Sequence, residues 1–136
     1  MPKRFLLSVL AGIICIAATA CSVEKVSEEK LKDLEYTVVA SDEIPEELMT
    51  KIEEEKKEPM TLTYGDKGYL YIAKGYGAQE TSGYSIEMKE LYETENSICF
   101  KTELLGPDKS EQILEKETYP YIVVKIEENE KYVVFQ

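Results

Sequence analysis

A series of short strand-like segments joined by turn-forming residues constrains the fold of this chain most strongly. β-Branched and aromatic residues dominate each segment, and glycine, asparagine or charged residues separate them. The expected strands are 36–39, 60–64, 69–73, 83–92, 97–105, 120–127 and 131–135. Strands at this close spacing favour sheets built from neighbouring antiparallel strands. We therefore predict a mainly β (α+β) domain, either an antiparallel β-sandwich or a barrel-like sheet.

Two of these segments indicate which way their side chains face. In the segment 84–89, Tyr84, Ile86 and Met88 alternate with polar residues, as expected when only one face of a strand is buried. In the segment 121–126, apolar residues occupy both faces. A strand of that kind is central in its sheet or lies between two layers.

One amphipathic helix is expected at about residues 45–57. Pro45 suits the first helical position, where its missing N–H costs nothing. Apolar residues then recur at every fourth position as Ile44, Leu48 and Ile52. The pattern also predicts a Glu53–Lys57 pair on the solvated side, and Pro59 ends the helix because the residue before a proline avoids the α region. We expect this helix to pack on an open face or edge of the sheet.

The first twenty residues have the pattern of a secretory signal. Lys3 and Arg4 precede an uncharged run over residues 5–18 that, at about 1.5 Å per residue, is shorter than the roughly 30 Å bilayer core. The run ends in Ala18-Thr-Ala-Cys21, which resembles a bacterial lipobox, although the usual leucine is replaced by alanine. The resemblance implies a lipid on Cys21. The alternative is an ordinary signal peptide that leaves Cys21 as a free thiol.

These features predict a three-part chain. Residues 1–20 form a lipoprotein signal peptide, residues 21–34 a lipidated cysteine with a charged tether, and residues 35–136 a single globular domain. The net charge of −11 repels anionic headgroups, so the lipid on Cys21 and no basic patch would hold the protein at the membrane. We expect a lipid anchor on the extracytoplasmic face of the cell membrane.

Composition excludes several classes of function. The sequence contains no histidine, so it cannot form a Ser-His-Asp or Cys-His nucleophile or a zinc site that uses histidine. The acidic balance argues against nucleic acid as a partner, because phosphate binding needs clustered basic residues. Cys99 lies in the middle of an expected strand without a histidine partner and is interpreted as structural. We expect no catalytic residue, metal or cofactor.

One glycine-rich segment, 75–84, stands out as a candidate site. It opens a strand, whereas a loop that cradles a dinucleotide must open a helix, so phosphate binding is rejected. Two interpretations remain open: a plain hairpin loop, or an exposed recognition loop held by strands. The second displays the candidate partner-binding residues Gln79, Thr81, Ser82, Gly83 and Tyr84. Tyr84 could instead belong to the core through its alternation with Ile86 and Met88.

The chain resembles the PrcB family, accessory lipoproteins of bacterial secreted protease complexes, in their C-terminal domain. The resemblance covers about residues 69–136 and is carried by five stretches: Tyr69-Leu-Tyr-Ile-Ala-Lys-Gly75, Glu80-Thr-Ser-Gly-Tyr-Ser85, Leu105-Gly-Pro107, Thr118-Tyr-Pro-Tyr-Ile-Val-Val-Lys125 and Val133-Val-Phe135. It implies a noncatalytic binding module that acts as an accessory or stabilising subunit, with an exported protease as its protein partner.

A second resemblance indicates a different class of protein. Gln79-Glu-Thr-Ser-Gly-Tyr84 is similar to the Asn-Pro-Thr-Thr-Gly-Tyr loop of chagasin-like inhibitors of cysteine proteases. The other two loops of that family have no counterpart here, and the sequence contains no tryptophan for one of them. Cysteine protease inhibition, or ligand binding by a general cell-surface lipoprotein, therefore remains as an alternative function.

Overall fold

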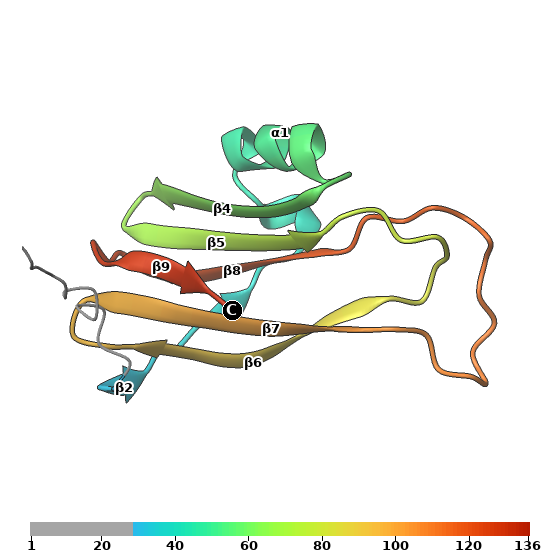
Figure 1. Ribbon diagram of the computed structural model, residues 1–136. Helices are drawn as coiled ribbons and strands as arrows, with labels where there is room; N and C mark the ends of the chain where they lie inside the picture. The colour runs from blue at the N-terminus through green and yellow to red at the C-terminus, as the bar shows by residue number, and fades with distance from the viewer. Residues whose placement is uncertain (1–28) are drawn as a thin grey trace, which may run out of the picture.

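The computed structural model describes residues 29–136 and contains two four-stranded sheets and one α-helix (Figure 1). In chain order its elements are β2 (Lys32–Asp33), β3 (Thr37–Val38), the 3-10 helix η3 (Ser41–Glu43), α1 (Glu46–Glu55), β4 (Pro59–Asp66), β5 (Tyr69–Tyr76), β6 (Ser85–Glu93), β7 (Ser97–Leu105), β8 (Tyr121–Glu127) and β9 (Tyr132–Phe135). The expected signal peptide at 1–20 and the expected lipid site at Cys21 lie outside the described residues.

The two sheets pack face to face as a sandwich, and neither closes into a barrel. The first sheet has the order β3-β8-β5-β4 and is antiparallel throughout. The second has the order β2-β6-β7-β9, in which β7 and β9 are parallel. The prediction of a mainly β, α+β fold is confirmed. Of the two predicted arrangements, a β-sandwich and a barrel-like sheet, the structure has the sandwich. The parallel pair was not expected, and it arises because β8 and β9 belong to different sheets and so cannot form a hairpin.

A tight turn joins β4 to β5. Asp66 pairs with Tyr69, which leaves only Lys67 and Gly68 in the loop. Both of these residues have positive φ, 52° and 87°. Two successive residues of this kind form the turn whose twist matches that of the flanking strands, and glycine accepts the second position without a steric cost.

The first sheet is buried on both faces, so the fold has three layers. Side chains alternate along β8: Val123 faces α1, and Val124 faces the second sheet. β5 behaves in the same way, with Ala73 on the helix side and Ile72 between the sheets. This double burial confirms the expectation for the segment 121–126, and the helix covers an open face of the sheet as predicted.

The helix lies within its predicted range but differs from the prediction at both ends. Pro45 precedes the first helical residue, with an extended ψ of 142°, so it is the N-cap and not the first helical position. Glu53 pairs with Lys56 at 2.9 Å instead of with Lys57. Lys57 lies beyond the last helical residue, Glu55, and the helical spacing that would bring it to Glu53 is lost there.

Sheet pairing begins slightly ahead of the predicted domain start at Glu35. The backbone N–H groups of Leu31 and Leu34 donate to the carbonyls of Glu93 and Leu91, at 2.8 and 3.0 Å. The side chain of Leu34 packs against the core between the sheets. The end of the expected tether at 21–34 therefore forms the edge strand β2. Within the described part of the chain, no helix is long and apolar enough to cross a membrane.

Candidate functional site

Two long loops extend together from one end of the sandwich (Figure 1). One comprises residues 77–84 and joins β5 to β6, and the other comprises residues 106–120 and joins β7 to β8. We call these two segments the double-loop extension. Each loop connects the two sheets, because its flanking strands lie in different layers. The expectation of a hairpin loop at 75–84 is therefore wrong, and Gly75 and Tyr76 belong to β5.

The first loop leaves β5 through a glycine that no other residue replaces easily. Gly77 has a φ of 79°, and a Cβ atom there would lie 3.1 Å from both the Cδ and the nitrogen of Pro59. The next residue, Ala78, donates its N–H to the carbonyl of Lys57 at 3.2 Å. The exit of the loop is thus fixed against the segment between α1 and β4.

Backbone hydrogen bonds then join the first loop to the end of the second. The N–H of Gln79 donates to the carbonyl of Thr118 at 2.8 Å, and the N–H of Thr118 donates back at 2.9 Å. The side-chain amide of Gln79 turns inward and donates to the carbonyl of Tyr76 at 3.3 Å. Thr118 also donates its hydroxyl to the carbonyl of Thr81 at 2.8 Å. Gln79 and Thr81 therefore hold the two loops together.

Ser82 makes a second connection further along the extension. Its hydroxyl oxygen accepts the N–H of Leu114 at 2.8 Å, and its own N–H donates to the carbonyl of Leu114 at 3.1 Å. The hydroxyl of Thr81 donates to the carbonyl of Ser82 at 3.0 Å. Both side chains are half-buried. The expectation that Thr81 and Ser82 are exposed is wrong, because their polar groups satisfy backbone groups of the loops.

Gly83 and Tyr84 complete the contact between the loops. Gly83 has a φ of 94°, and a Cβ atom there would lie 2.8 Å from the Cβ of Pro107. Tyr84 is half-buried, and its ring reaches within 3.6 Å of the position that a Cβ atom on Gly106 would occupy. The structure thus brings all five candidate residues together, but at the seam between the loops.

A polar contact between the sheets supports the base of the extension. The hydroxyl groups of Tyr76 on β5 and Thr102 on β7 lie 2.6 Å apart. The ammonium group of Lys74 lies 5.0 Å from the centre of the Tyr76 ring, a cation–π distance. Since β5 and β7 each lead into one of the two loops, this contact fixes the strands from which both loops depart.

The surface of the extension carries apolar residues that sequence reasoning missed. Ile113 and Leu114 in the second loop have exposed fractions of 39% and 64%, and Leu105, at the end of β7 beside the loop, is 38% exposed. Ile113 and Leu114 stand between charged residues in Glu111-Gln-Ile-Leu-Glu-Lys116. An apolar pair isolated in a charged loop was the available signal, and it was overlooked because it lies outside any expected strand. Aliphatic side chains on a positioned loop are well suited to contact another protein.

The second loop has its own internal support near Asp108. The Asp108 carboxylate accepts the N–H and the hydroxyl of Ser110, at 3.1 and 3.2 Å. These donors hold the pKa of Asp108 below its ordinary value. The carbonyl of Asp108 also accepts the N–H of Glu111 at 2.9 Å. This short turn reverses the chain between Leu105 and Ile113.

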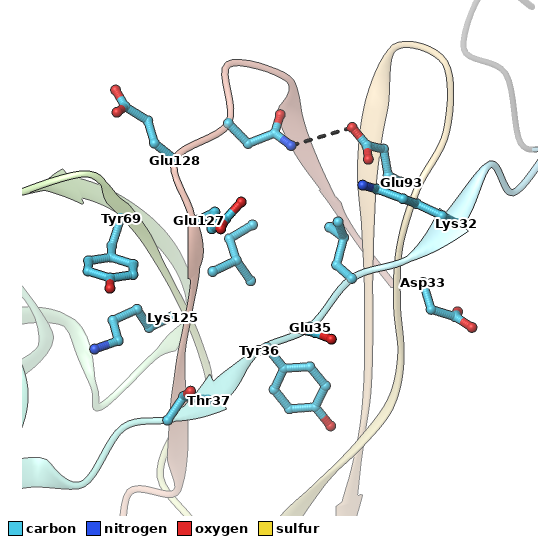
Figure 2. A pocket seen from close by; sticks show the side chains of 13 residues that line it. Lys32, Asp33, Glu35, Tyr36, Thr37, Tyr69, Glu93, Lys125, Glu127 and Glu128 are labelled. Atoms are coloured by element: carbon cyan, nitrogen blue, oxygen red, sulfur yellow. Dashed lines mark hydrogen bonds between the residues drawn. The ribbon is translucent and has the colours of Figure 1, made fainter.

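A second candidate site is a groove of about 650 Å³ at the opposite end of the sandwich. Figure 2 shows Tyr69 and Lys125 on one side of it and the strand with Lys32 and Asp33 on the other. The ammonium group of Lys125 lies 4.6 Å from the centre of the Tyr69 ring. The remaining carboxylates of the lining come from Glu35, Glu93, Glu127 and Glu128.

The strongest interactions in this groove stabilise the fold. The Glu93 carboxylate accepts a hydrogen bond from the ammonium group of Lys131 at 2.8 Å and lies 3.5 Å from the amide of Asn129. The bond from Lys131 lowers the pKa of Glu93 below its ordinary value. Lys131 donates as well to the carbonyl of Thr94 at 2.7 Å. The ion pair therefore ties the turn after β6 to the start of β9.

Among residues 29–136, no group of three or more potential metal-binding side chains is close enough to hold an ion. Cys99 has a free thiol, and the residue is only 4% exposed in the middle of β7. A buried thiol without a general base is a packing residue and not a nucleophile. The geometry of both candidate sites is suited to binding, and the double-loop extension exposes the aliphatic side chains of Ile113 and Leu114.

Comparison with known proteins identifies the segment that contains this extension. Residues 70–127 match the family model described as PrcB C-terminal. This segment is similar to the PrcB C-terminal domain. It begins in β5 and ends with β8, so the domain match includes both loops of the extension. Neither a curated protein nor a solved structure matches the chain.

The sequence analysis noted a resemblance to the PrcB family, and this match confirms that prediction. The match links this segment to a family associated with protease complexes. The match omits α1, β4 and β9, which complete the sandwich around it. The match thus covers the two central strands of the first sheet, the central pair of the second, and the loops between them.

Proposed function

We propose that this protein is a lipid-anchored, extracytoplasmic and noncatalytic binding module that serves as an accessory or stabilising subunit of a secreted protease complex. The observation that carries the proposal is the PrcB C-terminal match, whose limits of 70 and 127 enclose the double-loop extension. The absence of histidine from the sequence supports a noncatalytic role. Anchoring rests on the lipobox-like Ala18-Thr-Ala-Cys21 after a short apolar run.

The double-loop extension would supply the partner contact. Gln79, Thr81, Ser82, Gly83 and Tyr84 set the shape of the extension, and the exposed leucine and isoleucine side chains would meet the protease. A few residues near the centre of an interface, in positions from which water is excluded, contribute most of the binding energy. The chain's excess of acidic residues would act mainly on the rate of encounter.

Detergent extraction of the protein, followed by affinity purification and mass spectrometry, tests this function. Leu114→Ser should lower recovery of an exported protease by about tenfold, the effect of losing roughly 1.4 kcal/mol of binding. Leu31→Ser is the matched control, because Leu31 is 60% exposed against 64% for Leu114 but lies on the far end of the sandwich. Equal recovery from both variants would exclude Leu114 from the interface, and absence of any protease would refute the accessory role.

The same preparations separate the alternatives and test the anchor. Strong inhibition of papain-like enzymes by the purified domain would favour the chagasin-like function, although the half-buried Thr81 and Ser82 leave that loop few free groups to present. Recovery of glycan or lipid alone would favour a general ligand-binding lipoprotein.

For the anchor, a fatty-acid probe should label the wild type and not Cys21→Ala, and equal labelling would refute lipidation at Cys21.

A further inference from the structure

β4 forms one edge of the first sheet, and the pattern of its backbone groups can be worked out from the adjoining turn. Asp66 and Tyr69 flank a two-residue loop, so they form a hydrogen-bonded pair. Every second residue back from Asp66 then also bonds to β5. The N–H of Tyr76 confirms this alternation, because it points away from β4 and donates to Pro120 at 3.1 Å.

The remaining residues of β4 direct their backbone groups outward. These are Pro59, which lacks an N–H, and Thr61, Thr63 and Gly65, and all four are exposed. No other strand in the described part of the chain pairs with this edge. Met60, Leu62 and Tyr64 meanwhile direct their side chains under α1. β4 therefore presents a row of unpaired donors and acceptors beside a half-buried apolar row.

The other three sheet edges carry features that discourage a further strand along their length, whereas β4 carries one such feature, a proline at its first residue, Pro59. β2 and β3 are only two residues long, and β9 is four. β6 extends past β2, but it contains a bulge between Met88 and Glu90, and Lys89 there lies 3.4 Å from Glu103 on the neighbouring strand. Short edges, bulges and lysines are the devices that proteins use to block edge pairing. β4 has eight residues without a bulge or a lysine.

We propose that β4 accepts an extended segment of the partner protease as a fifth strand of the first sheet. The proposal rests on the proposed function for the identity of the partner. The backbone groups of Thr61, Thr63 and Gly65 would bond to the added strand, a known mode of peptide recognition. Alternate apolar residues of that segment would lie beside Met60 and Leu62.

Charge distinguishes a foreign strand from a second copy of this chain. In an antiparallel two-fold pairing that uses all of β4, the outward Thr61 of one copy lies opposite Thr63 of the other. That register places Glu58 opposite Asp66 at both ends, and like charges directly opposite each other are destabilising. The same two carboxylates favour a partner segment that carries Lys or Arg at its ends. The segment that we expect to pair with β4 is therefore uncharged or basic, with apolar residues at alternate positions.

Site-specific photo-cross-linking in the intact, detergent-extracted protein tests the proposal. A photoreactive residue at position 63 should cross-link to one continuous peptide of an exported protease. One at position 87, in the part of β6 that extends past β2 next to the bulge, should not. Thr63→Pro removes an outward N–H that β5 does not use, so it should lower protease recovery about tenfold or more, whereas Thr63→Ala should retain it. Should Thr63→Pro fail to fold, the cross-link map decides.

The other outcomes separate this inference from the proposed function. A protease that cross-links from position 114 in the double-loop extension but not from position 63 would overturn strand addition and leave the accessory role intact. Cross-linking of position 63 to a second copy of this chain would also overturn it. If no position captures a protease, both the accessory role and the strand addition fail.

Discussion

Replacement of Gly83 by alanine should loosen the double-loop extension more than any other single-methyl change in it. The added Cβ would lie 2.8 Å from the Cβ of Pro107, well inside van der Waals contact. The same residue has a φ of 94°, which alanine adopts only at a cost. The atom it meets belongs to a proline ring and has little freedom to move aside, so the two loops must separate.

The expected magnitude follows from two contributions. Placing alanine in a left-handed conformation costs about 1–2 kcal/mol. Overpacking against a rigid neighbour adds about 1–3 kcal/mol. Gly68→Ala isolates the first contribution, because Gly68 has a similar φ of 87° but no atom within 4 Å of the new Cβ. We therefore expect Gly83→Ala to lower the free energy of unfolding by about 2–5 kcal/mol and Gly68→Ala by about 1–2 kcal/mol.

Urea denaturation of both variants measures the difference, and protease recovery shows its functional result. Gly83→Ala should lower recovery of the partner, whereas Gly68→Ala should leave it unchanged despite its own loss of stability. Equal stability of the two variants, within about 0.5 kcal/mol, would refute the close packing of the first loop on Pro107. Full partner recovery by a destabilised Gly83→Ala would instead show that the shape of the extension does not matter for binding.

Three further changes test the packing and charge of the sandwich. Phe100 is fully buried between the sheets, so Phe100→Ala should cost about 3–5 kcal/mol in urea denaturation. The hydrogen bond to Glu47 raises the pKa of Tyr64 to about 12, so its contribution to stability should be complete below pH 10.0 and disappear as the pH rises through 12; Tyr64→Phe should then converge with the wild type. Lys131 lowers the pKa of Glu93, whose contribution exists above its ordinary value of 4.5 and is lost as the pH falls. Lys131→Met should therefore be less stable than the wild type at neutral pH and approach it in acid.

The sequence predicted the strands well where a local pattern was sufficient. The strand expected at 97–105 has the same limits in the structure, and the helix lies within 45–57. Both elements are specified by side-chain periodicity over a short window. Gly68 and the residues around it likewise indicate their own turn, since the need for positive φ is local.

The sequence could not predict which strands share a sheet. A plain hairpin loop was one interpretation of residues 75–84, but there the chain crosses to the other sheet, as it also does between β8 and β9. Local composition does not distinguish a turn within a sheet from a short crossover between packed sheets. The pairing of β2 was missed for a related reason, because Lys32 and Asp33 have side chains typical of a solvated tether and are held through their backbone.

The structure brings the candidate residues at 79–84 together, but their contacts could not be seen without the second loop. Hydroxyl groups on Thr81 and Ser82 have the chemistry of recognition residues. In the structure, however, the Ser82 hydroxyl accepts the N–H of Leu114, far away in the sequence, and the Thr81 hydroxyl donates to the carbonyl of Ser82. Glycine next to them permits the close approach of a second segment. A polar, glycine-rich loop is thus equally consistent with a displayed surface and with a seam, and only the tertiary contacts distinguish the two.

Tyr84 illustrates why this distinction matters for locating the partner. Its ring packs over Gly106 and is half-buried, so it belongs neither to the core between the sheets nor to the outer surface. Loss of the ring would let the bases of the two loops move apart, and partner binding could fall without any direct contact to Tyr84. The side chain of Leu114, by contrast, is exposed and does not hold the loops together. The bonds to Ser82 come from the backbone of residue 114. A loss of binding in Leu114→Ser therefore reports contact, whereas the same loss in Tyr84→Ala reports the position of the loops.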